Sequence, residues 1–237
     1  MSTTTTSTEP PGRTEVGGER RTGPTPRATV RRLPDRARYD RETIAAILDE
    51  GLVCHVGFVD AGQPYVVPSA YARQGERIVV HGQAASRMIT VLAGGTPACV
   101  TVTLLDGLVL ARSGFHHSMN YRSVVVLGTA AEITDPAEKR LALDAIVEHV
   151  APGRLSSVRP PSEAEMRATR VVALPLDEAS AKVRTGPPKD AEDDYALGIW
   201  AGELPLRLEP LEPVADPRLD PGVRPPPHVT GWRRGRR

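Results

Sequence analysis

The sequence has few of the residues and runs that mark several classes of protein. Only two of its 237 residues are cysteines, and only 4% are aromatic. Cys54 and Cys99 stand singly within apolar runs, which predicts two buried thiols rather than a disulfide or a metal-binding pair. No apolar run approaches the roughly 20 residues of a membrane span, and the N-terminus lacks the apolar core of a secretory signal. We therefore expect a cytoplasmic protein with no part in the membrane.

Charge is also scarce in one place and concentrated in another. The net charge is only +1, yet residues 1–38 contain eight Arg against four acidic residues, and residues 216–237 contain six Arg against two. The segment between the two ends is therefore negatively charged, which argues against nucleic acid as a partner of the core. The basic ends are either solvated or make weak contacts with anionic surfaces.

Composition divides the chain into three parts. Residues 1–34 are rich in Thr, Gly, Pro and Arg without periodicity, which predicts a disordered N-terminal tail. In residues 211–237 proline recurs every few positions, which excludes regular helix and central strand and predicts an extended C-terminal arm. Residues 35–210 carry the apolar periodicity, so we expect a single domain there.

The middle part consists mainly of short apolar segments separated by turns. Residues 52–59, 64–72 and 77–82 alternate with DAGQ and QGE, a pattern that predicts antiparallel hairpins. Further strands are expected at 97–105, 108–113 and 121–134, with a two-residue turn at Asp106–Gly107. Because only one short helix interrupts these six strands, we expect a mainly β fold, a six-stranded antiparallel Greek-key-like barrel with peripheral helices.

Helix signals occur around this barrel. Asp40 can cap a helix that ends at Gly51, and Ser162 with Glu165 forms a capping-box pattern. A longer helix is expected to start at Asp135 and Pro136. The residues expected on its buried face are Leu141, Ile146 and Val150.

The first candidate site is the segment HGQAASRM, residues 81–88, which follows an apolar strand. Ser86 and Arg87 at a helix start would offer backbone N–H groups, a hydroxyl and a fixed cation to a phosphate monoester. A capping serine followed by a solvated arginine explains the same letters, so both interpretations stay open. The glycine patterns of dinucleotide-binding and P-loop proteins are absent from the sequence.

The second candidate site is the polar segment 114–123, which leads into an apolar strand. Asn120 and His117 are candidates for substrate contacts, although His117 also fits an ordinary loop histidine. His116 and His117 are adjacent and would point to opposite faces of an extended chain, so we expect no shared metal. No serine lies in a G-x-S-x-G pattern, which disfavours a serine hydrolase.

Together, PSAYA, HGQAASRM, CVTVTLLDGLVLARS and FHHSMNYRSVVVLGTAAEITDPAEK resemble the pyridoxamine 5′-phosphate oxidase-like, FMN-binding split-barrel family. The similarity is to the branch that includes the nitroimidazole-resistance reductases, and it spans roughly residues 39–208. It implies a homodimer in which each of two interface clefts holds FMN. Ser86 and Arg87 would then bind the flavin phosphate, and Trp200 would either cover the partner's flavin or pack as an ordinary tryptophan. The cofactor-binding residues that the resemblance implies are Val67, Pro68, Ser69, His81, Gly82, Ser86, Arg87, Met88, Tyr121, Arg122, Ser123 and Trp200.

The function implied by the resemblance is that of an FMN-dependent oxidoreductase. Such a protein would take electrons from a donor such as a reduced nicotinamide and pass them to a small planar acceptor, while its residues supply binding and orientation. The R-x-H pattern that grips pyridoxal phosphate is missing near the C-terminus, which disfavours that substrate. A split barrel that binds a deazaflavin or haem, and a flavin-binding protein without catalytic activity, are the alternatives.

Overall fold

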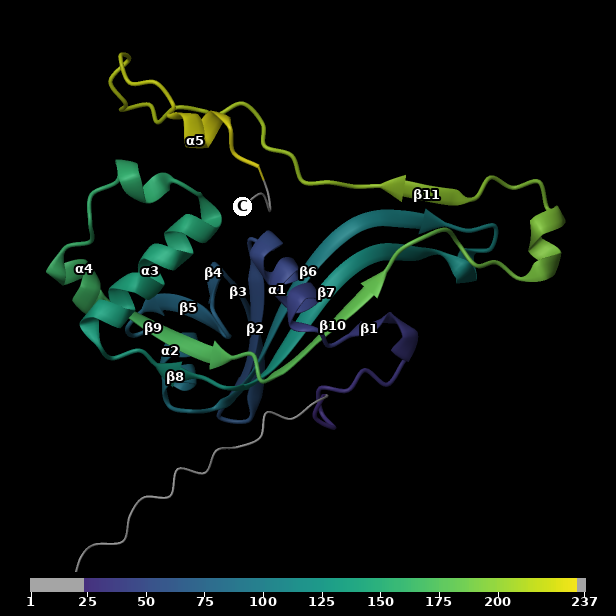
Figure 1. The fold of residues 1–237 in the computed structure, drawn as a ribbon, viewed down its shortest axis with the longest axis horizontal. Helices are drawn as coiled ribbons and strands as arrows, with labels where there is room; N and C mark the ends of the chain where they lie inside the picture. The colour runs from purple at the N-terminus through teal and green to yellow at the C-terminus, as the bar shows by residue number, and fades with distance from the viewer. Residues whose placement is uncertain (1–23, 234–237) are drawn as a thin grey trace, which may run out of the picture.

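The computed structural model describes residues 24–233, which form two antiparallel sheets with helices around them (Figure 1). The larger sheet has the strand order β1-β10-β7-β6-β2-β3, and β11 pairs with β6 beyond this path. The smaller sheet has the order β4-β5-β9-β8. The strands are β1 (Ala37–Arg38), β2 (Cys54–Asp60), β3 (Gln63–Ser69), β4 (Tyr71–Gln74), β5 (Arg77–Gln83), β6 (Pro97–Leu110), β7 (Ser118–Thr129), β8 (Ala131–Glu132), β9 (Thr169–Pro175), β10 (Glu178–Arg184) and β11 (Gly202–Pro205).

The helices lie around the sheets, and α1, α2 and α3 each connect one strand to the next along the chain. In Figure 1, α3, η3 and α4 gather at the end of the molecule that holds the smaller sheet, and β6, β7 and β11 extend away from it. The helical elements are η1 (Pro34–Arg36), α1 (Arg41–Glu50), α2 (Arg87–Ala93), η2 (Gly114–His116), α3 (Pro136–Val150), η3 (Arg154–Ser157), α4 (Glu163–Ala168), η4 (Glu192–Ala196) and α5 (Pro227–Thr230). No helix among the described residues is long and apolar enough to cross a membrane.

The expected mainly β, antiparallel split-barrel fold with peripheral helices is confirmed, although the number of strands differs from the six expected. The described residues form eleven strands in two sheets, and the sheet is not closed. The strand β9, far along the chain, pairs with β5, and the short β8 pairs with β9 in turn. These partners complete a separate four-stranded sheet. A prediction that pairs only strands adjacent in the sequence does not anticipate it.

The predicted turn at Asp106–Gly107 is also wrong. One strand, β6, runs through both residues, and only a register irregularity between Leu105 and Gly107 marks the position. The reason is β11, which pairs with this half of β6 and places Pro205 opposite Gly107. A Cβ at Gly107 would lie 3.0 Å from the carbonyl oxygen of Leu204, so glycine serves close strand approach rather than a turn.

The main core lies between the two sheets, and α1 and α2 pack against it. The cap of α1 is formed as predicted, because the Asp40 side chain accepts a hydrogen bond from the Thr43 N–H, and Ile44, Ile47 and Leu48 are buried. Gly51 follows this helix where a Cβ would come within 2.6 Å of the Tyr71 hydroxyl. Close packing, not a left-handed turn, therefore requires this glycine.

The buried face of α3 differs from the prediction. Ile146 is buried as expected, but Leu141 is 62% exposed and Val150 is 40% exposed. The helix instead buries Ala142 and His149, while Leu143 and Val147 line a cavity. The capping box of Ser162 and Glu165 at α4 is present as predicted.

The two cysteines are both free thiols. Burial raises the pKa of the Cys54 thiol to about 12, so this thiol stays protonated. The prediction of two buried thiols is confirmed for Cys54, whereas Cys99 is only partly buried.

The chain ends are described in part. Residues 1–23, most of the predicted N-terminal tail, lie outside the described residues, whereas Ala28 is buried and Arg27 pairs with Glu178. Leu211 and Val214 in the C-terminal arm are 90% and 95% exposed. The domain limits at residues 35 and 210 stay a prediction.

Candidate functional site

His81 occupies an unusual position near the end of β5. It lies opposite Val171 of β9, and its Nδ1 atom is buried without a hydrogen-bond partner among the described residues. Burial lowers the pKa of the imidazole, because the charged form is poorly solvated there. A neutral imidazole with a free ring nitrogen is the form that binds a metal ion.

A cavity of about 610 Å³ lies beside His81, under α3, η3 and α4. Its volume falls within the range of roughly 300–1,000 Å³ that is typical of cofactor sites. Most of its wall is apolar, which suits a large planar ligand with little charge at its centre. The apolar side chains of the wall are Leu143, Ile146, Val147, Leu155, Val158, Pro160, Pro161 and Met166.

Charged side chains also line this cavity. Arg140 donates from Nε to the Asp144 carboxylate at 2.8 Å, and Arg159 pairs with Glu165 at 2.6 Å. The terminal nitrogens of Arg140 are not used in that bond and can bind a ligand carboxylate. The cavity thus combines an apolar wall, a histidine with a lowered pKa and two guanidinium groups, each paired with a carboxylate.

The described residues contain no group of three or more His, Cys, Asp or Glu side chains that could hold a bare metal ion. An iron held in a macrocycle needs only one or two side-chain ligands, because the ring supplies the other four. The residues of the cavity therefore fit a haem better than a free ion.

Ser86 and Arg87 show features of both interpretations, a phosphate-binding site and a helix cap followed by a solvated arginine. Ser86 Oγ accepts a hydrogen bond from the Ile89 N–H at 3.4 Å, so this serine caps α2. The Arg87 guanidinium lies 4.6 Å from the centre of the Tyr65 ring and 3.5 Å from the Asp60 carboxylate. Its side chain is 57% exposed, so the cation is oriented by β2 and β3 yet open to an anion.

Gly82 brings α2 onto β5. A Cβ at this position would lie 2.8 Å from Ile89 Cγ1 and 3.4 Å from Ser86 Oγ. The glycine therefore explains how the end of β5, which carries His81, packs against the start of α2. Met88, the next residue of α2 after Arg87, packs against the apolar core.

The predicted flavin-ring segment Val67–Ser69 lies on β3 at the edge of the larger sheet. Pro68 pairs with His55 and Ser69 with Cys54, both on β2. The opposite edge of β3 pairs with no strand in the described sheet. Its main-chain groups are thus placed where they could bond a ligand.

Residues 120–123 lie on β7, and their side chains make contacts within the chain. Arg122 donates to the carboxylates of Asp106 and Glu50, which raises its pKa. Asn120 is buried, donates to Glu203 and accepts from Arg184. These residues therefore connect β7 to its neighbours. The other candidate site, at the start of α2, lies elsewhere, because α2 packs against β2, β5, β8 and β9.

Three other residues that were predicted to bind cofactor or substrate lie on or near this segment. Ser123 Oγ donates to the Lys182 carbonyl at 3.4 Å, and Tyr121 pairs with Leu105 across the sheet. His117 is exposed, and its Nδ1 lies 3.0 Å from the Ser113 carbonyl oxygen. The assignment of these residues to cofactor or substrate stays a prediction.

Trp200 lies just before β11 and is 68% exposed. Its ring covers Gly202, where a Cβ would lie 3.0 Å from the indole. A tryptophan this exposed has most of its surface available to a ligand or a second chain.

Sequence reasoning missed the cavity. Arg140, Arg159 and Met166 come from three separate elements, and no motif joins them. The available signal was the unusually wide apolar surface of α3, where Leu143, Ile146 and Val147 continue beyond one buried stripe.

The two-sheet antiparallel fold with peripheral helices is that of the split-barrel proteins. The family model described as pyridoxamine 5′-phosphate oxidase matches residues 40–183. The chain belongs to this family. No curated protein sequence matches the chain.

Three solved structures are similar to the chain. The flavocytochrome Anf3 from Azotobacter vinelandii is 44% identical, with a TM-score of 0.84, and the match covers 89% of this chain and 98% of that one. The FAD and heme binding protein from Mycobacterium smegmatis is 37% identical, with a TM-score of 0.79 and coverage of 83% and 96%. A putative 5-nitroimidazole antibiotic resistance protein from Bacteroides thetaiotaomicron is 28% identical, with a TM-score of 0.53 and coverage of 62% and 86%.

Proposed function

We propose that this protein binds both a haem and a flavin nucleotide and acts as an oxidoreductase. The observation that carries the proposal is the buried, unpartnered Nδ1 of His81 beside an apolar cavity of about 610 Å³. The proposal is supported by two relatives that match most of this chain, one named a flavocytochrome and the other an FAD and heme binding protein.

His81 would hold the haem iron. A buried polar nitrogen without a partner costs free energy, and an iron ligand would remove that cost. The apolar wall of the cavity would contact the macrocycle, and Arg140 and Arg159 would bind its propionates. Haem, which was an alternative at the level of sequence, thus becomes part of the leading proposal.

The flavin nucleotide would lie at the edge formed by β3 and the start of α2. Arg87 would bind its phosphate, and the main chain of Val67–Ser69 would bond the ring. FMN and FAD share the phosphate next to the ribityl chain, so Arg87 would bind either nucleotide in the same way. The name of the M. smegmatis relative favours FAD over the FMN expected from sequence.

A second copy of the chain would complete the flavin cleft. Tyr121, Ser123 and Trp200 belong to the part of the molecule that extends away from the smaller sheet. Exposed apolar side chains occur on β3 and on this extension, at Val66 and Met119. Homodimerisation would cover these side chains and bring the two sets of residues together.

When bound, a flavin exchanges a hydride or two electrons, and a haem iron exchanges single electrons. The chain itself would orient the two groups, keep water from the cavity and hold His81 neutral. The electron donor would be a reduced nicotinamide and the acceptor a small planar molecule.

The test is to purify the protein and record its absorption spectrum, and then to identify by mass the groups released on denaturation. A Soret band together with a flavin spectrum is expected, and a reduced nicotinamide nucleotide should bleach the flavin. A protein with flavin but no haem, after supplementation with haem, would contradict the proposal. Bound flavin that no reduced nicotinamide nucleotide can reduce would support a flavin-binding protein without catalytic activity.

A further inference from the structure

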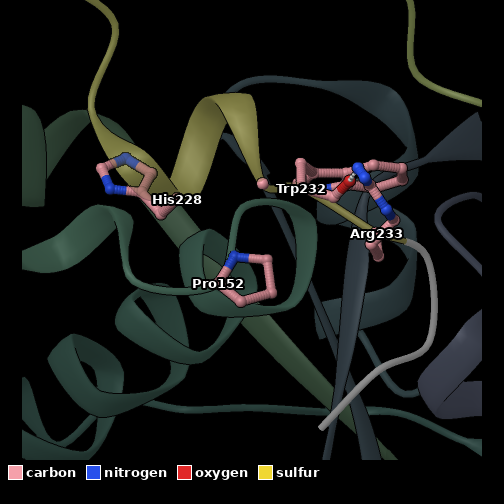
Figure 2. A pocket seen from close by; sticks show the side chains of 5 residues that line it. Pro152, His228, Trp232 and Arg233 are labelled. Carbon is pink, nitrogen blue, oxygen red and sulfur yellow. Dashed lines mark hydrogen bonds between the residues drawn. The ribbon is translucent and has the colours of Figure 1, made fainter.

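The C-terminal end of the described chain folds back onto the end of α3. The short helix α5 (Pro227–Thr230) is followed by Trp232, whose indole N–H donates to the Val150 carbonyl at 3.0 Å. Figure 2 shows Pro152 below α5, between His228 and Trp232. This contact occupies one of the carbonyl groups that the last turn of α3 leaves without a helical partner.

Gly153 permits the close approach of α5. Its φ is +85°, and a Cβ at this position would lie 3.2 Å from His228 Cβ. A side chain here would strain the backbone and press on α5 at the same time. The turn after α3 is therefore shaped to accept the C-terminal segment.

The turn that α5 contacts is also part of the cavity wall. Leu155 and Val158 line the cavity beside His81. On its other side, the turn is held by the Glu148 carboxylate, which accepts from the Gly153 and Leu155 N–H groups at 2.7 and 2.9 Å. Residues 151–158 thus form a lid, here called the cavity lid, that α3 holds from one side and α5 from the other.

The connection between β11 and α5 can release this contact. Leu211 and Val214 are almost fully exposed, and the side-chain hydrogen bonds described for residues 207–225 are local to that segment. Detaching α5 and Trp232 would disturb neither sheet. A short helix on a long exposed tether loses little by opening, because few buried contacts hold it.

We propose that residues 227–233 are a releasable latch on the cavity lid and that they set how fast the ligand of the cavity enters and leaves. This inference rests on the proposed function for the identity of the ligand as haem. The contact between latch and lid can be tested without any ligand.

The test compares a chain that ends at Pro226 with a chain that ends at Arg233, which keeps α5 and Trp232. Hydrogen–deuterium exchange of the apoproteins should show the amides of residues 151–158 exchanging about tenfold faster in the shorter chain, since a hydrogen bond and the cover of an indole ring are lost. The rate of haem transfer from each holoprotein to apomyoglobin should rise by a similar factor, with the Soret maximum unchanged.

Equal amide exchange rates of residues 151–158 in the two chains would show that residues 227–233 do not hold the cavity lid, whether or not haem binds. Faster exchange with equal haem transfer would overturn the latch's control of ligand exit. Absence of haem binding by the longer chain would defeat the proposed function, and the exchange rates would still decide the contact. Trp232→Phe, which keeps the ring and removes the N–H donor, should give a smaller increase of about threefold.

Discussion

His149 lies on α3 and His81 lines the cavity next to that helix, but the surroundings of the two differ. His149 is 6% exposed, its Nε2 lies 2.6 Å from the Gly51 carbonyl oxygen, and its ring lies 4.8 Å from that of Tyr71. His81 has a buried Nδ1 without a partner, next to a cavity. Buried polar groups in native proteins almost always have partners. The contrast therefore gives His149 a structural role and supports the proposal that His81 binds a ligand.

The largest expected effect on stability is that of His149→Ala. It would leave the Gly51 carbonyl without its donor and remove the ring packed on Tyr71, so the free energy of unfolding should fall by about 2–4 kcal/mol. Urea denaturation of the apoprotein measures the loss. His81→Ala is the matched variant, and it should change the stability of the apoprotein by less than about 1 kcal/mol. Equal losses in the two variants would remove the contrast.

Arg87→Ala tests the second candidate site. Loss of a charge-assisted contact with the flavin phosphate should weaken flavin nucleotide binding roughly 10- to 100-fold, as measured by fluorescence titration. Riboflavin, which has no phosphate, should bind both proteins alike. Arg167→Ala, which removes an exposed arginine of α4 that pairs with Glu163, is the control. Unchanged flavin nucleotide affinity in Arg87→Ala would leave the residue as a solvated neighbour of a helix cap.

Arg122→Ala should lower the stability of the fold more than the affinity for the flavin. The guanidinium joins β7 to Asp106 and Glu50, and about 30% of each partner is exposed. Solvent screening limits such pairs, so the expected loss is about 1–2 kcal/mol in the free energy of unfolding. Arg122→Lys should recover only part of it, because an ammonium lacks the planar fork. A large fall in flavin affinity without loss of stability would instead place Arg122 at the cofactor.

The smallest expected effect is a pH dependence that His81 gives to the apoprotein. Its folded-state pKa lies below the ordinary value of 6.5, so the unfolded chain binds more protons near that pH. The contribution of neutral His81 is complete above pH 6.5 and decreases as the pH falls toward the lowered pKa. Wild type should therefore lose stability relative to His81→Ala as the pH falls below 6.5. Parallel curves through this range would contradict a lowered pKa.

Local signals in the sequence were sufficient for several elements. The caps at Asp40, Ser86 and Ser162 were predicted because each depends on residues within one turn of the helix. The antiparallel hairpin of β2 and β3 was predicted from its short turn, where Ala61 and Gly62 have positive φ angles.

Features that depend on distant segments were not predicted. Asp106–Gly107 has the composition of a hairpin turn, but β11 pairs with this stretch from about a hundred residues away. Leu141 matches the apolar period of α3 yet is exposed, because the helix turns other residues toward the sheet. His81 was assigned to the cofactor by resemblance, while its free nitrogen became visible only when α3, η3 and α4 were placed beside it.

The most direct test of the central claim is a haem titration of three apoproteins, with the Soret band as the readout. Wild type and His55→Ala, which removes an exposed histidine of β2, should bind haem with the same stoichiometry and the same spectrum. His81→Ala should lose the ligand-field signature of a histidine-bound iron and bind at least tenfold more weakly, and added imidazole should restore the spectrum. An identical spectrum and affinity in His81→Ala and wild type would show that His81 does not hold the iron.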